Sequence, residues 1–182
     1  MQLTGKQVAI LATDGFEESE LTKPKEALEN AGAEVHIISP KSDTIKSWDQ
    51  DDWGQEFTVD RSLNRARVAD YDLLVLPGGQ INPDKLRIEQ EALDFIKHFH
   101  ATGKPIGAIC HAPWLLVETG IARDRKLTSF KSIQTDLKNA GANWVDRSVV
   151  VDDNLITSRN PDDLPDFNEK LIEALVKERI AV

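Results

Sequence analysis

"PIGAICHAPWLL", residues 105–116, joins an apolar run directly to a helical pattern, with Cys110 and His111 at the junction. PIGAI (105–109) has the length and the continuous apolar character of a strand that is buried on both faces. HAPWLLVETG (111–120) is typical of a short helix. Since a strand that leads straight into a helix is the repeating unit of α/β proteins, this stretch predicts a parallel sheet covered by helices.

The rest of the chain repeats this alternation. We expect strands at 7–12, 34–39 and 72–76, a hairpin of two strands around Asp153–Asn154, and helices at 18–32, 83–103, 132–141 and from residue 164 onward. The acidic segment 40–62, which contains SWDQDDWGQEF, breaks the pattern and is predicted to be a surface excursion, either two short strands or a lid. In a mostly parallel sheet, ligands collect at the carboxyl ends of the strands.

Length and charge limit the function classes. With 182 residues we expect one domain over 1–182. The net charge of −9 argues against nucleic acid or an anionic membrane as the main partner. The start of the chain does not resemble a signal peptide, and no apolar run approaches the roughly 18 residues of a membrane span. We therefore predict a cytoplasmic protein, in which the single cysteine is reduced and forms no intrachain disulfide.

Cys110 is the candidate nucleophile, because a cysteine at a strand-to-helix turn faces the first amides of the helix, which favour the thiolate. The alternative is a small buried core residue. Gly78 and Gly79 follow the strand at 72–76 directly. They form either a simple turn or a pair of backbone amides that can approach a ligand closely and act as oxyanion donors.

Acidic residues follow the first strand in the sequence GFEESE. They are favoured at a helix N-terminus in any protein, but Glu17 and Glu20 are three residues apart and can share one helix face. A carboxyl group aimed at the Cys110 sulfur would couple the two titrations. We predict no metal site, because no Cys/His cluster has ligand spacing, and no cofactor, because no glycine-rich loop matches a nucleotide-binding motif.

These motifs together resemble the ThiJ/PfpI superfamily, specifically its PfpI-type intracellular peptidase and deglycase branch. The resemblance rests on LPGG, GKPIGAICHAPWLL, ILATDGFEESEL, RKLTSFKSIQTDLKNAGA and LITSRNPDDLPDFN, which are spread over nearly the whole chain. It implies a flavodoxin-like three-layer α/β sandwich with a mostly parallel sheet, similar to class I glutamine amidotransferases. It also implies assembly into dimers or larger homo-oligomers.

The resemblance assigns roles to individual residues. Cys110 would be the strained elbow nucleophile, and Glu20 the glutamate whose carboxyl contacts its sulfur. Glu17 would line the same pocket. The amides of Gly79 and His111 would form the oxyanion hole.

Three positions bear on how the chain fits the family pattern. Asp84 would orient His111 from the neighbouring subunit, where some relatives have glutamate. Ala112 replaces a frequent glycine, and Trp114 replaces a smaller polar residue. These two replacements predict a tighter and more apolar pocket mouth.

Three functions are compatible with these residues. The first is a stress-protective enzyme acting on glyoxal, methylglyoxal or their adducts on small molecules and glycated proteins, as a glyoxalase or deglycase. The second is an intracellular cysteine peptidase that uses Cys110, His111 and Asp84 of two chains, although a histidine adjacent to its nucleophile must turn back to reach it. The third is a non-enzymatic stress protein that senses oxidants through Cys110 or acts like a chaperone.

Overall fold

A seven-stranded sheet lies at the centre of the computed structural model, which describes residues 2–180 except for the side chains of 178–180. The strand order is β11–β12–β8–β7–β1–β3–β6, and all neighbours are parallel except β11 and β12. The strands are Val149–Asp152 (β11), Leu155–Ser158 (β12), Ile106–Ile109 (β8), Leu73–Leu76 (β7), Gln7–Leu11 (β1), Glu34–Ser39 (β3) and Arg61–Ser62 (β6). The predicted mostly parallel α/β sheet is confirmed, and so is the hairpin around Asp153–Asn154.

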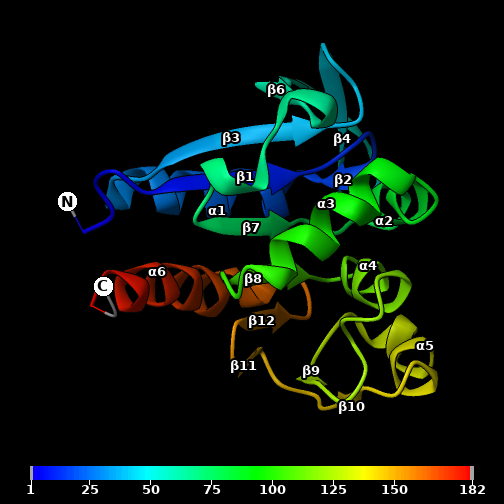
Figure 1. Cartoon of the computed structure of the whole chain (residues 1–182). Coiled ribbons are helices and arrows are strands. Elements are labelled where there is room, and N and C mark those ends of the chain that lie inside the picture. The colour runs from blue at the N-terminus through cyan, green and yellow to red at the C-terminus, as the bar shows by residue number, and fades with distance from the viewer. Residues whose placement is uncertain (1, 181–182) are drawn as a thin grey trace.

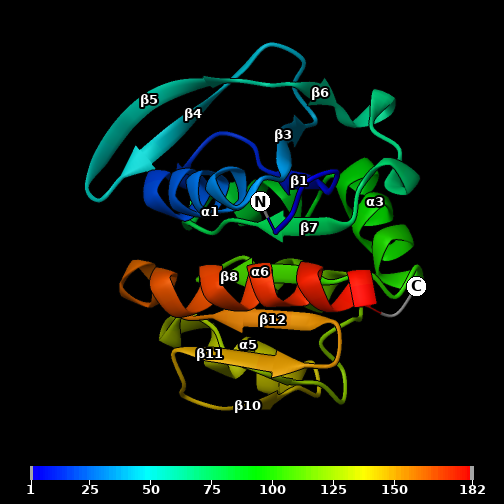
Figure 2. The same ribbon diagram turned by 90° about the vertical axis from the view of Figure 1, so that its left-hand side faces the viewer.

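Helices cover both faces of this sheet (Figure 1). Figure 2 shows α1 (Glu18–Ala31) and α6 (Leu164–Ile180) side by side along one face. The other face carries α2, α3, α4 and α5, which are Ile81–Leu86, Gln90–Ala101, Pro113–Glu118 and Gln134–Asn139. None of the helices in residues 2–180 combines the length and apolar character needed to cross a bilayer.

Alternation along the buried strands divides the core into two layers. In β1, Val8 and Ile10 belong to the layer with α1 and α6, whereas Ala9 and Leu11 belong to the layer with α3 and α4. All four side chains are fully buried. Since successive side chains of a strand point to opposite faces, a continuous apolar run is what a sheet covered on both faces requires.

Smaller elements lie around the central sheet. The segment predicted as a surface excursion forms β4 (Thr44–Asp49) and β5 (Asp52–Thr58), an antiparallel hairpin that pairs with β2 (Phe16–Glu17) in a separate three-stranded sheet. In Figure 2 this hairpin rises from the central sheet beside α1. A parallel pair of short strands, β9 (Lys126–Leu127) and β10 (Asn143–Trp144), precedes β11. Four 3-10 turns complete the chain, at Leu63–Arg65, Val68–Asp70, Lys131–Ile133 and Pro161–Asp163.

The single helix predicted at 83–103 is wrong, because the structure has two helices there. Between α2 and α3 the chain is bent, and Ile88 is 82% exposed. Glu89 has extended backbone angles and its N–H bonds to Leu86 O. The apolar spacing of Leu93, Ile96 and Phe99 describes α3 alone, since Ile88 has no place in the core.

Gly107 in β8 marks the closest approach of the sheet to α6. A Cβ atom there would lie 2.5 Å from Leu171 Cδ2 and 3.0 Å from Phe167 Cζ. We expect Gly107→Ala to lower the free energy of unfolding by about 1–3 kcal/mol, the usual cost of overpacking a core. Urea denaturation measures this loss. Adding Leu171→Val, which removes the colliding atom, should make the double variant less destabilised than the sum of the single ones, and strict additivity would contradict this explanation.

Candidate active site

Cys110 lies at the carboxyl end of β8, at the bend that leads to α4. Its φ angle is +63°, a left-handed conformation that costs a non-glycine residue about 1–3 kcal/mol. Two backbone hydrogen bonds hold the bend, from Cys110 N–H to Ser158 O at 3.1 Å and from Phe130 N–H to Cys110 O at 2.9 Å. The side chain is only 6% exposed, yet it lines a cavity of about 480 Å³. The strain is therefore maintained where the thiol meets this cavity.

Glu20 approaches this thiol from the first turn of α1 and has no exposed surface. The Gly78 N–H donates a hydrogen bond of 2.8 Å to Glu20 Oε2. A Cβ atom on Gly78 would lie 2.7 Å from both Glu20 Oε2 and Cys110 Cβ, so the carboxyl, the glycine and the thiol are in contact. The expectation that the Gly78 amide faces a ligand is wrong: its N–H is used by Glu20, and Gly78 does not line the cavity.

Burial decides the protonation of Glu20 and Cys110. It raises the pKa of Glu20 to about 8, so this carboxyl keeps its proton at neutral pH. Burial, followed by the charge of an ionised Glu20, also raises the pKa of Cys110 well above its ordinary value. The predicted effect of the helix amides on the Cys110 pKa is therefore opposed by a larger effect of burial. Because a protonated Glu20 removes the repulsion, the pair carries at most one negative charge at neutral pH.

Backbone amides act on Cys110 in the opposite direction. The N–H groups of Gly79 and His111 hydrogen-bond to the Cys110 sulfur and lower its pKa. Gly79 has a φ angle of +71°, and a Cβ atom there would lie 2.6 Å from Glu17 N and Gly15 O. This position therefore requires glycine for both its conformation and its contacts.

Asn82 fixes the turn that carries Gly78 and Gly79. Its buried amide donates to Pro77 O at 2.9 Å and to Gly78 O at 3.1 Å, and its Oδ1 accepts from Thr13 N–H at 2.8 Å. It thus ties the turn after β7 to the turn after β1. Nothing in the sequence distinguishes Asn82 as a site residue, since polar residues are common beside turns.

The His111 ring does turn back to the thiol. Its Nδ1 lies 3.1 Å from Cys110 Sγ, and its Nε2 lies 3.0 Å from Ser132 Oγ. Phe130 stacks on the ring with centroids 4.8 Å apart. Burial lowers the pKa of His111, so the imidazole is neutral at pH 7 and can accept a proton.

Within one chain, Trp114 and Asp84 both lie outside the cavity. Trp114 contacts His111 from outside the cavity, with ring centroids 5.3 Å apart, and its Nε1 donates to Asp136 Oδ2 at 2.8 Å. The prediction that Trp114 forms the pocket mouth is therefore wrong. Asp84 is exposed on α2, and within one chain the ring nitrogens of His111 contact Cys110 and Ser132 instead. The contact of Asp84 with His111 of a neighbouring subunit stays a prediction.

The cavity walls come from segments distant in sequence. Of the expected residues, it is lined by Cys110, His111, Glu20, Glu17 and Gly79. Burial raises the pKa of Glu17, although the Gln50 N–H bonds to its carboxyl. The remaining lining residues are Gly15, Trp48, Gln50, Gln80, Ile81, Phe130 and Pro161, none of which the sequence analysis singled out.

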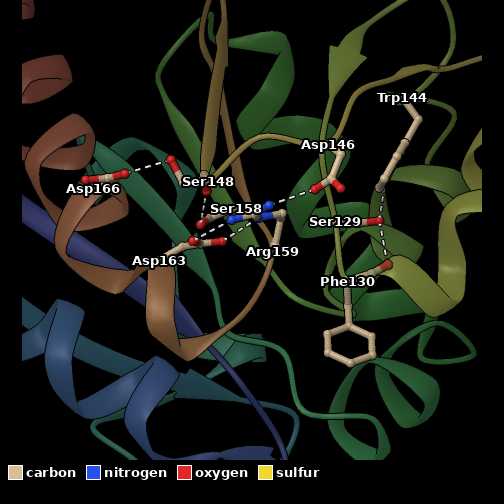
Figure 3. A network of polar contacts seen from close by, with 9 residues as sticks. All are labelled: Ser129, Phe130, Trp144, Asp146, Ser148, Ser158, Arg159, Asp163 and Asp166. Carbon is tan, nitrogen blue, oxygen red and sulfur yellow. Dashed lines mark hydrogen bonds and ion pairs between the residues drawn. The ribbon is translucent and has the colours of Figure 1, made fainter.

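A polar network fixes the wall that contains Phe130 (Figure 3). Trp144 Nε1 donates to Ser129 Oγ, which in turn donates to Phe130 O, each at 2.9 Å. Nearby, Arg159 bonds Asp163 through two nitrogens at 2.8 and 3.0 Å and Asp146 at 2.7 Å. These bonds hold the loops before β11 and after β12 against the site. Among the side chains that the structure describes, residues 2–177, no group of three or more His, Cys, Asp or Glu is arranged to hold a metal ion.

Comparison with known proteins identifies the family of this chain. The DJ-1/PfpI family matches residues 6–174. This chain belongs to the DJ-1/PfpI family. An uncharacterized protein of Staphylococcus epidermidis is 46% identical over 172 residues, which cover 93% of this chain and 98% of that protein. Escherichia coli protein/nucleic acid deglycase 2 is 44% identical over the same shares of the two chains.

Solved DJ-1/PfpI structures share the fold. Drosophila melanogaster DJ-1beta has a TM-score of 0.85 and 31% identity, with 95% of this chain and 94% of that chain covered. The flavodoxin-like arrangement implied by the resemblance is therefore confirmed.

Proposed function

We propose that this DJ-1/PfpI protein is a cytoplasmic, cysteine-dependent enzyme that converts glyoxal, methylglyoxal or their adducts to hydroxy acids. The observation that carries the proposal is the strained Cys110 thiol lining a cavity, with a buried carboxyl and a neutral imidazole both against the sulfur. The deglycase name of the Escherichia coli relative supports the same substrate class.

For methylglyoxal the chemistry balances with water alone. Cys110 Sγ bonds to the aldehyde carbon while its proton passes to His111 Nδ1, and the new oxyanion accepts hydrogen bonds from the Gly79 and His111 amides. His111 returns this proton to the oxyanion. The neutral ring then takes the proton of the sulfur-bearing carbon while protonated Glu20 donates to the neighbouring carbonyl oxygen, which forms an enediol. His111 passes its proton to the second carbon, and Glu20 regains a proton from the first hydroxyl, which leaves a thioester. Water cleaves the thioester to lactate and restores the thiol. For an adduct, Cys110 Sγ displaces the amine or thiol from the carbinol carbon, and the leaving group takes the Cys110 proton through His111.

A peptidase is less well supported, because the cavity of about 480 Å³ is small for an extended peptide. We propose that the chain also self-associates. A dimer that brings Asp84 of a second copy to Ser132 would extend the hydrogen bonds that run from Cys110 through His111 to Ser132.

The direct test measures methylglyoxal loss and lactate formation with the purified protein. We expect one lactate per methylglyoxal consumed, with no loss of a fluorogenic peptide in a parallel assay. Cleavage of the peptide without lactate formation would contradict the proposal and favour the peptidase.

A further inference from the structure

The β4–β5 hairpin supplies Trp48 and Gln50 to the cavity wall near Cys110. The tip of the hairpin is held internally: Trp48 Nε1 donates to Gln50 O at 2.9 Å, and the Trp48 ring meets the Trp53 ring edge-on at 5.6 Å. Gln50 has a left-handed φ angle of +60°. A large aromatic side chain is thus presented to the cavity from a segment outside the central sheet.

The Glu18 carboxylate accepts hydrogen bonds from both strands of this hairpin. Glu18 Oε2 accepts from Ser47 Oγ at 2.6 Å and from Gln55 N–H at 3.1 Å, and its Oε1 accepts from Gln55 Nε2 at 3.0 Å. Ser47 precedes Trp48, and its Oγ also lies 3.1 Å from Gln55 O. Glu18 lies between Glu17 and Glu20 in sequence, yet it does not line the cavity.

Gly54 leaves space for the hydrogen bonds between Glu18 and the hairpin. A Cβ atom at this position would collide with the Glu18 carboxylate and with the Ser47 hydroxyl. The glycine has no positive φ angle to explain it, so its small size is the relevant property. The Ser47 hydroxyl, followed by the Gln55 N–H, lowers the pKa of Glu18. Glu18 is therefore ionised in the neutral pH range and keeps accepting these hydrogen bonds.

We propose that Glu18 is a positioning residue that holds the β4–β5 hairpin so that Trp48 bounds the cavity and admits only small electrophiles to Cys110. The claim about electrophile size rests on the geometry alone, and its extension to carbonyl substrates rests on the proposed function. Glu18 touches neither the thiol nor the cavity, so its effect must be transmitted through Ser47 and Trp48.

The test compares alkylation of Cys110 by a small reagent, iodoacetamide, and a bulky one, N-phenylmaleimide. In Trp48→Ala and Glu18→Ala, the ratio of the bulky to the small rate should rise about tenfold, as for other changes of pocket size. Gly54→Ala, which displaces the carboxylate by a different route, should raise the same ratio. The matched control is Glu26→Ala, an exposed residue on the same helix whose carboxylate pairs with Lys23 on the surface.

The outcomes separate the two proposals. A ratio that rises in Trp48→Ala but not in Glu18→Ala or Gly54→Ala, with all three folded by circular dichroism, overturns the role of Glu18. The ratio of kcat/KM for phenylglyoxal over methylglyoxal should follow the alkylation ratio. If no protein consumes either carbonyl while the alkylation ratio still rises, the proposed function fails and the positioning role stands.

Discussion

Cys110→Ala is expected to reduce methylglyoxal consumption to the rate measured without protein, because no other cysteine exists to attack the carbonyl carbon. The fold should persist, since the bend is held by backbone hydrogen bonds to Ser158 and Phe130 that do not involve the sulfur. The measurement is lactate formation beside the wild-type protein, with thermal melting to confirm folding.

Cys110→Gly provides the control that separates chemistry from backbone strain. It should be equally inactive. However, glycine adopts the φ angle of +63° without the steric cost that alanine incurs, so its free energy of unfolding should exceed that of Cys110→Ala by about 1 kcal/mol. Residual turnover in either variant would remove Cys110 from the mechanism, and equal stability of the two would contradict the strain.

Glu20→Gln is expected to stabilise the protein at neutral pH while lowering activity by about 100-fold or more, the usual contribution of a proton-transferring group. The amide keeps an oxygen for the Gly78 N–H and has nearly the same shape as the protonated carboxyl. It cannot release or return a proton. Loss of activity and gain of stability should therefore appear in the same variant.

The sign of the stability effect follows from the pKa of Glu20. Burial raises this pKa from 4.5 to about 8, so between these values the folded protein binds one more proton than the unfolded chain. The stabilisation that the raised pKa of Glu20 gives to the folded protein is complete below pH 4.5. It is lost as the pH rises toward 8. At about 1.4 kcal/mol per pH unit, the loss between pH 5 and pH 7 is about 3 kcal/mol.

Urea denaturation of both proteins at pH 5, 6, 7 and 8 measures this difference. The wild-type free energy of unfolding should fall relative to that of Glu20→Gln as the pH rises, while all other titrations cancel between the two. Glu26→Gln, at an exposed position of the same helix, should follow the wild type. Parallel curves for wild type and Glu20→Gln would contradict a protonated Glu20.

The sequence predicts the central sheet well because burial on both faces leaves continuous apolar runs such as QVAIL and LLVL. It also brings Cys110, Glu20 and Gly79 to one edge, since the carboxyl ends of parallel strands must meet there. The strands follow from their apolar runs, and the meeting of the site residues follows from the parallel direction of the strands.

What the sequence could not predict depends on tertiary contacts. Trp48 and Gln50 reach the cavity only because the hairpin folds back onto Glu18, and Phe130 only because its loop bonds to Cys110 O. The amides and the carboxyl that act on the Cys110 pKa are predicted from the sequence. The burial that outweighs the amides depends on how the whole core packs, which no local pattern predicts.

Because the groups around Cys110 come from distant parts of the chain, the unfolded polypeptide contains only an ordinary thiol. The size-selective alkylation proposed above would therefore be a property of the folded molecule alone. The rate at which a cysteine reagent labels this one sulfur atom would therefore measure the folded fraction of a sample.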